Sequence, residues 1–91
     1  MDFKEAKIME ATAYTYTGRN TFTGEPPAVG LIAVDPRVIP LGSKVYVEGY
    51  GYARAADTGS SIKGDRIDIF LEDRRSCMEW GRRTVKVYLL E

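Results

Sequence analysis

The sequence predicts a small closed β-barrel of about six short strands with one helix. Apolar and β-branched residues fall in short runs that glycine- and proline-rich turns separate. The chain has 91 residues, which suits one domain with a modest core. No long helix follows any of the expected strands, and this excludes a doubly wound parallel sheet. Closing the sheet into a barrel lets so few strands avoid exposed edges.

The first half of the chain alternates strand signals with turn signals. Residues 7–16, KIMEATAYTY, are rich in β-branched and aromatic residues and predict a strand. Residues 17–27, TGRNTFTGEPP, hold two glycines, an asparagine and two prolines, which predicts a surface loop. The apolar run at 30–34, GLIAV, predicts a buried strand, and residues 35–43 predict a connection fixed by prolines.

The middle of the chain predicts two further strands around a tight turn. Residues 44–49, KVYVEG, alternate between apolar and polar side chains. Gly49 and Gly51 then mark the turn, and YARAAD at 52–57 is the next expected strand. Residues 58–66, TGSSIKGDR, carry two more glycines and predict a loop.

Residues 67–71, IDIFL, alternate again and predict a strand with two unlike faces. One face carries apolar residues only: Ile67, Ile69 and Leu71. Asp68 and Phe70 lie on the other face, so Asp68 can face a groove while its neighbours fill the barrel. A charged residue is disfavoured in mid-strand, which indicates a function for Asp68.

After residue 71 the spacing of apolar side chains changes to that of a helix. Asp73 is a suitable N-cap for RRSCMEW at 74–80, and Gly81 stands where a helix C-cap glycine belongs. We expect Trp80 to be a core residue. TVKVYLL at 84–90 predicts the closing strand.

Composition excludes several kinds of chemistry. Thirteen Lys and Arg residues balance thirteen Asp and Glu residues, and this neutral chain lacks the basic footprint of a nucleic-acid-binding protein. Histidine is absent, which removes Ser-His-Asp and Cys-His catalysis. Cys77 is the only cysteine, so neither an internal disulfide nor a thiolate zinc site is possible. Chemistry must come from carboxylates, hydroxyls, Lys63, arginines or backbone amides.

The tetrapeptide at 57–60, Asp-Thr-Gly-Ser, is the catalytic motif of aspartic proteases. A dimeric protease of the retroviral type is near this length and joins two such loops, whose aspartates share a proton. Too few residues follow Gly59 for a flap and the remaining core strands. The preceding ARAA also carries Arg54 where a buried strand should lead into the loop. The protease is therefore a remote alternative.

Four segments in order carry a more specific resemblance over about residues 10–90. They are TAYTYT with TFTGEPP, then GLIAVDPRVIPLGSKVYVEGYG, then AADTG, then IKGDRIDIF. Their order and spacing resemble the 3D domain, named for three aspartates. This domain is the catalytic barrel of MltA-type membrane-bound lytic transglycosylases, and it occurs alone in small cell-wall proteins of Gram-positive bacteria. The resemblance implies an all-β fold with one short helix, a six-stranded double-psi β-barrel, and a peptidoglycan substrate. It implies no metal or organic cofactor.

The three aspartates of the family map onto Asp35, Asp57 and Asp68, and the catalytic aspartate of the MltA type maps onto Asp68. A general acid must be protonated near neutral pH, whereas an isolated aspartic acid has a pKa of about 3.9. Burial or a neighbouring carboxylate raises that pKa, so we expect the three aspartates to converge at one end or one face of the barrel. Structural alternatives exist for two of them. Asp35 before Pro36 is a common turn initiator, and Asp57 can hold its loop by bonding backbone amides.

Further residues are candidates for holding the glycan. We expect four residues to bind substrate: Thr21, Thr23, Thr58 and Lys63. Thr21 and Thr23 lie in a loop that resembles a family motif and can bond sugar hydroxyls, while the alternative for Lys63 is a solvated turn lysine. Four tyrosines can stack on sugars, although most aromatic residues in so small a domain are core: Tyr14, Tyr16, Tyr50 and Tyr52.

The resemblance leads us to expect peptidoglycan lytic transglycosylase activity in one domain at residues 1–91. The large MltA enzymes have a second domain that walls the glycan cleft, so we expect an additional domain or self-association to complete the groove here. The N-terminal MDFKEAKIMEA has no apolar stretch of the signal-peptide kind. Since peptidoglycan lies outside the cytoplasmic membrane, we expect a longer, exported protein at the cell wall. The main alternative is a non-catalytic, expansin-like glycan-binding module. A raised pKa at Asp68 favours the enzyme.

Overall fold

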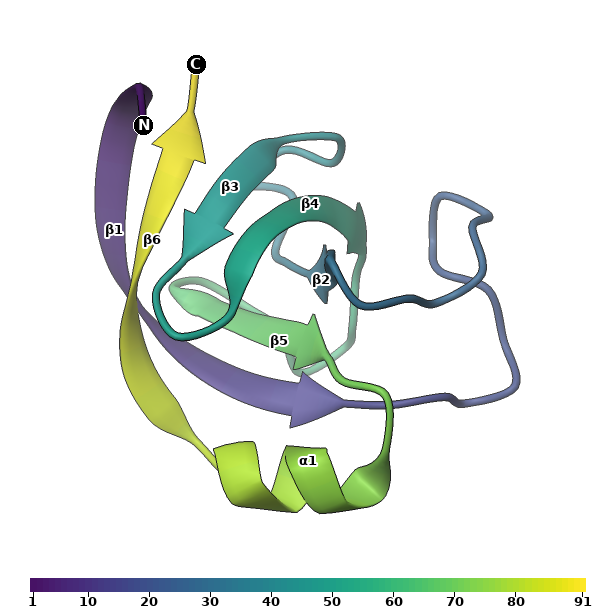
Figure 1. The fold of residues 1–91 in the computed structure, drawn as a ribbon. Helices are drawn as coiled ribbons and strands as arrows, with labels where there is room; N and C mark the ends of the chain where they lie inside the picture. The colour runs from purple at the N-terminus through teal and green to yellow at the C-terminus, as the bar shows by residue number, and fades with distance from the viewer.

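The computed structural model describes residues 1–91 as a closed barrel of six strands with one short helix (Figure 1). The elements in chain order are β1 (Phe3–Tyr14), β2 (Leu31–Ala33), β3 (Lys44–Val47), β4 (Gly51–Asp57), β5 (Arg66–Phe70), α1 (Arg74–Trp80) and β6 (Arg83–Leu90). Around the barrel the strands follow the order β1-β5-β2-β4-β3-β6. The predicted closed barrel with one helix is confirmed.

The sheet mixes parallel and antiparallel pairs. β1 pairs with β5 in parallel and β2 pairs with β4 in parallel, whereas the other four pairings are antiparallel. The strand expected at 7–16 instead runs from Phe3 to Tyr14. Its early start has a physical cause, because β6 pairs with it from Phe3 to Ala11 and satisfies its backbone groups.

Alternating side chains fill the barrel as the strand patterns predict. Ile67 and Ile69 on β5 are fully buried, and they join a core of 15 residues that every strand supplies. Asp68 lies on the opposite face of β5, as does Phe70, which is buried outside that core. The outer face of β5 is therefore where polar chemistry can be placed.

The helix closes one end of the barrel beside β1 (Figure 1). The Asp73 carboxylate accepts a hydrogen bond from the Ser76 backbone N–H at 2.7 Å, and Gly81 ends the helix with φ 66°. Trp80 is buried in the core, as predicted, and its indole N–H donates to the Ala11 carbonyl at 3.2 Å. At seven residues, α1 falls short of a membrane span, and the structure has no helix suited to one.

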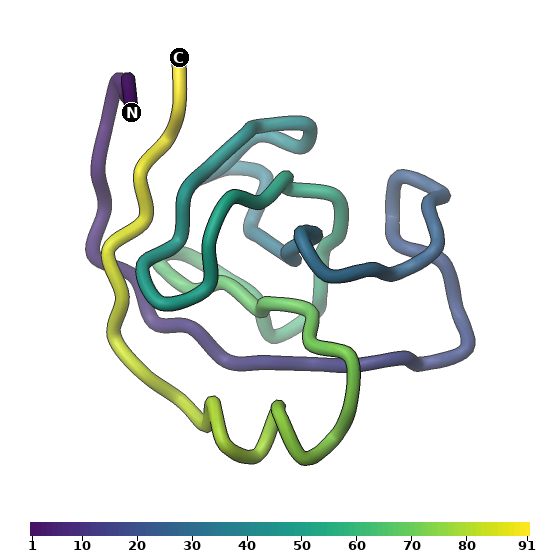
Figure 2. The backbone as a smooth tube through the Cα atoms, viewed as in Figure 1, coloured from purple at the N-terminus to yellow at the C-terminus, as the bar shows by residue number.

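The connection from β1 to β2 swings away from the barrel and returns to it (Figure 2). It contains turns and no strand between Tyr14 and Leu31, so the predicted loop at 17–27 is confirmed. The loop predicted at 58–66 lies between β4 and β5. These two loops rise beside the ends of β1, β2 and β4, and they form the walls of the site described next.

Candidate functional site

Strand register places Asp57 and Asp68 on either side of Ala33. In the parallel pair β2–β4, Ala33 is the partner of Asp57, and in the antiparallel pair β2–β5 it is the partner of Asp68. Neighbouring strands lie about 4.8 Å apart, so the two aspartate Cα atoms are separated by roughly 10 Å. The small side chain between them leaves room above the sheet. The two aspartates, 11 residues apart in the sequence numbering, thus belong to one site.

Both aspartates line a cavity of about 310 Å³, here called the acid cavity. Its floor comes from β1, β2, β4 and β5, and its walls come from the two loops. The lining residues are Tyr14, Thr17, Arg19, Pro27, Ala33, Asp57, Thr58, Gly59, Ser60, Ser61, Ile62 and Asp68. A polar hollow of about 350 Å³ shares Thr17, Arg19, Asp57 and Thr58 with it. The two hollows give the surface a continuous polar groove with Asp57 at the junction.

A larger hollow of about 540 Å³ lies elsewhere, against β3, β4 and residues 25–31. It is lined mainly by apolar side chains such as Leu31, Val45 and Ala53. Its only acidic lining residue, Glu25, is paired with Arg54. Size alone would favour this hollow, but it holds no free carboxyl group for proton transfer, so the acid cavity is the better candidate for chemistry.

Asp68 is more than half buried at the floor of the acid cavity. Its Oδ1 accepts a hydrogen bond from the Thr12 hydroxyl at 3.0 Å, and Thr12 is its register partner on β1. Burial raises the pKa of Asp68, the Thr12 hydrogen bond and the Arg66 charge lower it by less, and the Asp57 charge raises it further. The net direction is upward. Asp68 therefore holds its proton to higher pH than an isolated aspartic acid.

Asp57 is fixed by backbone amides through one of its carboxylate oxygens. Its Oδ1 accepts from the Phe22 N–H at 2.9 Å and from the Thr58 N–H at 2.8 Å. Its Oδ2 has no backbone partner, and the Tyr14 hydroxyl lies close to the carboxylate. Asp57 thus combines the loop-holding role anticipated as its structural alternative with a place in the groove.

Asp35 follows Val34, whose N–H bonds to the Asp57 carbonyl at 2.9 Å, so it lies near the same end of the barrel but does not share the acid cavity with the other two aspartates. It lines neither hollow of the groove. Its buried carboxylate accepts from the Arg37 N–H at 3.0 Å, from the Arg37 guanidinium at 3.0 and 3.1 Å, and from the Gly64 N–H at 2.9 Å. These bonds, those from Arg37 first, hold the pKa of Asp35 well below its usual range. The turn after β2 carries Asp35 towards the base of the 58–64 loop, which it ties down.

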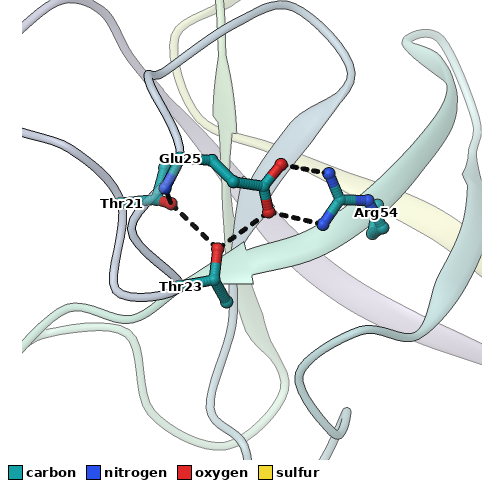
Figure 3. Close-up of polar contacts among 4 residues, drawn as sticks. All are labelled: Thr21, Thr23, Glu25 and Arg54. Carbon is teal, nitrogen blue, oxygen red and sulfur yellow. Dashed lines mark hydrogen bonds and ion pairs between the residues drawn. The ribbon is translucent and has the colours of Figure 1, made fainter.

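Thr21 and Thr23 belong to a network that fastens the first loop to β4 (Figure 3). The Thr21 and Thr23 hydroxyls lie 3.1 Å apart, and Thr23 donates to Glu25 Oε1 at 2.8 Å. Arg54 on β4 holds the Glu25 carboxylate with both terminal nitrogens, with Nη1 at 2.6 Å from Oε1. Neither threonine lines the groove. Both hydroxyls thus stabilise the loop conformation in which the Phe22 N–H donates to Asp57.

The two remaining predicted binding residues differ in position. Thr58 lines both hollows, so a contact with a ligand there stays a prediction that the geometry permits. Lys63 is exposed and lines neither hollow, which agrees with its alternative as a solvated turn lysine.

Sequence reasoning missed Thr12 and Arg19, and it considered Tyr14 only as a residue that can stack on sugars. Thr12 and Tyr14 share the outer face of β1 because they are two residues apart, and that face meets Asp68 only through the parallel β1–β5 register. The alternation in KIMEATAYTY indicates that Thr12 and Tyr14 share a face of the strand. That this face meets Asp68 depends on a strand pairing between segments far apart in the chain.

The chain is similar to a known domain family and to two longer proteins of one bacterium. The family described as "3D domain" matches residues 30–91. The chain is 50% identical, over 92% of its length, to YabE of Bacillus subtilis strain 168, whose name refers to cell wall shaping. It is 48% identical, over 93% of its length, to the cell wall-binding protein YocH of the same organism. The chain spans 23% and 33% of these two relatives.

Solved structures share the barrel at low sequence identity. MltA of Escherichia coli with bound chitohexaose has a TM-score of 0.67 at 19% identity, over 79% of this chain and 27% of that one. A mutant expansin of Clavibacter michiganensis in complex with cellohexaose has a TM-score of 0.67 at 18% identity, over 96% of this chain and 51% of that one. These likenesses confirm the double-psi barrel as the fold.

Proposed function

The chain belongs to the 3D domain family, and from this premise we propose that it cleaves the glycan strands of peptidoglycan as a lytic transglycosylase. A role at cell-wall glycan is supported by relatives named for cell wall shaping and binding, and by neighbours solved with bound oligosaccharides. Since peptidoglycan lies outside the cytoplasmic membrane, we propose an extracytoplasmic location. The relatives are several times longer than this chain, so further domains are expected to complete the groove.

The observation that carries the proposal is the partly buried carboxyl of Asp68 at the floor of the acid cavity. Burial raises its pKa, which is the direction that a general acid requires at the start of the reaction. Asp68 gives its proton to the glycosidic oxygen as the bond from that oxygen to C1 of N-acetylmuramic acid breaks. The 6-hydroxyl of the same sugar then forms a bond to C1, and the Asp68 carboxylate takes up the proton that the hydroxyl loses.

This reaction needs a single carboxyl group that acts first as the acid and then as the base, and it consumes no water. The nucleophile is part of the substrate, so its effective concentration is high. Ordinary glycoside hydrolysis instead requires two catalytic carboxyl groups in defined roles. Asp57 is held by two backbone amides and is assigned a supporting role: its negative charge raises the pKa of Asp68, and the residue lines both hollows of the groove.

A glycan-binding module without catalysis is the second candidate. The likeness to the expansin covers 96% of this chain, a larger share than the likeness to MltA, and one relative is named a cell wall-binding protein. The groove formed by this chain alone is also open. The aspartic protease has no comparable support, because Asp57 is bonded to its own loop inside a 3D-domain barrel.

Mass spectrometry of purified peptidoglycan digested with the protein tests the proposal. We expect anhydro-muropeptides, each lighter by one water than the product of hydrolysis. Asp68→Asn should abolish their release, whereas Asp65→Asn, which changes an exposed turn aspartate nearby, should release them at the wild-type rate. Glycan that is bound and never cleaved, at any pH tested, would favour the binding module.

A further inference from the structure

The hydroxyl of Tyr14 is buried in the acid cavity close to the Asp57 carboxylate, and no hydrogen bond of regular geometry satisfies it. Tyr14 ends β1, two residues beyond Thr12 on the same face, which places its ring beside the Asp68 strand. The ring packs edge-to-face on Phe70, with centroids 5.5 Å apart. This packing holds the ring against β5, with its hydroxyl in the cavity.

The Tyr50 hydroxyl, by contrast, makes both a donor and an acceptor hydrogen bond. It accepts from the Gly30 N–H at 2.8 Å and donates to the Phe70 carbonyl at 2.7 Å. Both tyrosines are about half buried. The protein thus completes the hydrogen bonds of the tyrosine that holds the fold together and leaves incomplete those of the tyrosine that lines the cavity.

An unpaired buried hydroxyl is costly, and native structures rarely keep one without a function. Burial raises the pKa of Tyr14 above its ordinary value, and the charges of Asp57 and Asp68, with the approach of the hydroxyl to the Asp57 carboxylate, raise it further. The hydroxyl therefore stays protonated and remains a donor over the whole physiological range. The charged side chains that line the cavity are Asp57, Asp68 and Arg19, so the cavity carries both signs of charge and a neutral ligand with acceptor oxygens can be accommodated.

We infer that Tyr14 is the hydrogen-bond donor with which the acid cavity binds a neutral saccharide, through a ring, hydroxyl or acetamido oxygen of the sugar. The Asp57 carboxylate would accept from a sugar hydroxyl beside it. The pairing of one donor with a carboxylate acceptor suits a ligand that carries both kinds of group on adjacent atoms. This inference rests on the proposed function and adds a binding residue to it.

The test compares Tyr14→Phe with Tyr50→Phe. Chitohexaose is titrated by calorimetry into Asp68→Asn protein, which cannot cleave it, and into the same protein carrying each second change. Tyr14→Phe should bind roughly 3- to 10-fold more weakly, the usual worth of one hydrogen bond. Without ligand it should melt at the same temperature or slightly higher, because it loses no internal hydrogen bond of regular geometry.

Tyr50→Phe provides the opposite signature. It removes two internal hydrogen bonds, so it should lower the melting temperature and leave chitohexaose affinity unchanged below that temperature. Unchanged affinity in Tyr14→Phe, or a melting temperature lowered as far as that of Tyr50→Phe, would overturn the inference alone. No binding by the Asp68→Asn parent or the wild type would overturn the inference and the proposed function together.

Discussion

The Thr12 hydroxyl lies 3.0 Å from Asp68 Oδ1, and the two residues are partners in the parallel register of β1 and β5. The bond stabilises the charged form of Asp68 and so lowers its pKa, against the larger effect of burial. Thr12 thus limits how far burial raises the pKa of Asp68. The partner of Asp68 is therefore determined by the pairing of β1 with β5, since Thr12 lies far from Asp68 in the sequence.

Thr12→Val tests that relationship through the pH profile of product release. Removing the donor should raise the pKa of Asp68 further, so activity that needs protonated Asp68 should persist to higher pH. The alkaline limb of the profile should move upward. Thr84→Val changes an exposed strand threonine and should leave the profile in place. A downward movement would show that Thr12 does not favour the charged form.

Asp68→Asn should abolish cleavage and preserve the fold. Asparagine keeps the shape and can neither give nor take the proton, so a loss of about 100- to 10,000-fold is expected. Because folding raises the pKa of Asp68, its charged form is disfavoured in the folded state, and this cost is present above the folded-state pKa. The variant should therefore melt at an equal or higher temperature at neutral pH. Full activity in a folded variant would move the catalytic role to another residue.

Asp57→Asn should reduce cleavage less than Asp68→Asn does. It removes the negative charge that helps to raise the pKa of Asp68, so the alkaline limb of the pH profile should move downward. Its amide can still accept from the Phe22 and Thr58 N–H groups, which keeps the loop in place. Parallel measurement of product release and thermal melting checks both effects. Complete loss of release with a normal melting temperature would give Asp57 a direct part in proton transfer.

Asp35→Ala should destabilise the protein and loosen the 58–64 loop. Folding lowers the pKa of Asp35, so its contribution to stability is full above its unfolded pKa of about 3.9 and is lost as the pH falls through the lower folded value. The difference in melting temperature between wild type and variant should accordingly shrink below about pH 4. Arg37→Ala leaves the Gly64 bond intact and should cost less. Equal melting temperatures at neutral pH would remove Asp35 as a loop anchor.

Glu25→Gln tests the network that fastens the first loop to β4. The Arg54 guanidinium, and next the Thr23 hydroxyl, lower the pKa of Glu25 to about 2. The resulting stabilisation is complete above the unfolded pKa of about 4.3 and fades as the pH falls towards 2. Glu25→Gln should therefore lower the melting temperature at neutral pH and match wild type near pH 2. A double-mutant cycle with Arg54→Ala measures the coupling, and a zero coupling would contradict the network.

Much of the fold follows from local patterns. The alternation in IDIFL places Ile67 and Ile69 in the core and Asp68 outside it, and the structure agrees. Asp73 and Gly81 mark the ends of α1 as their capping chemistry predicts. Patterns of this kind depend on residues a few positions apart, so they can be read along the chain. The early start of β1 could not be, because its partner β6 lies at the other end of the chain.

The sequence by itself determined which groups could do chemistry here: with no histidine and a single cysteine, the work falls to carboxyl and hydroxyl groups. Only the tertiary structure decided which of them meet. Two strand registers bring Asp57 and Asp68 together across Ala33, while Asp35 is bonded to Gly64 in the loop and lines no part of the cavity. The physical reason is that a residue's type is local, whereas its burial, its neighbours and hence its pKa arise from strand pairings that join distant segments.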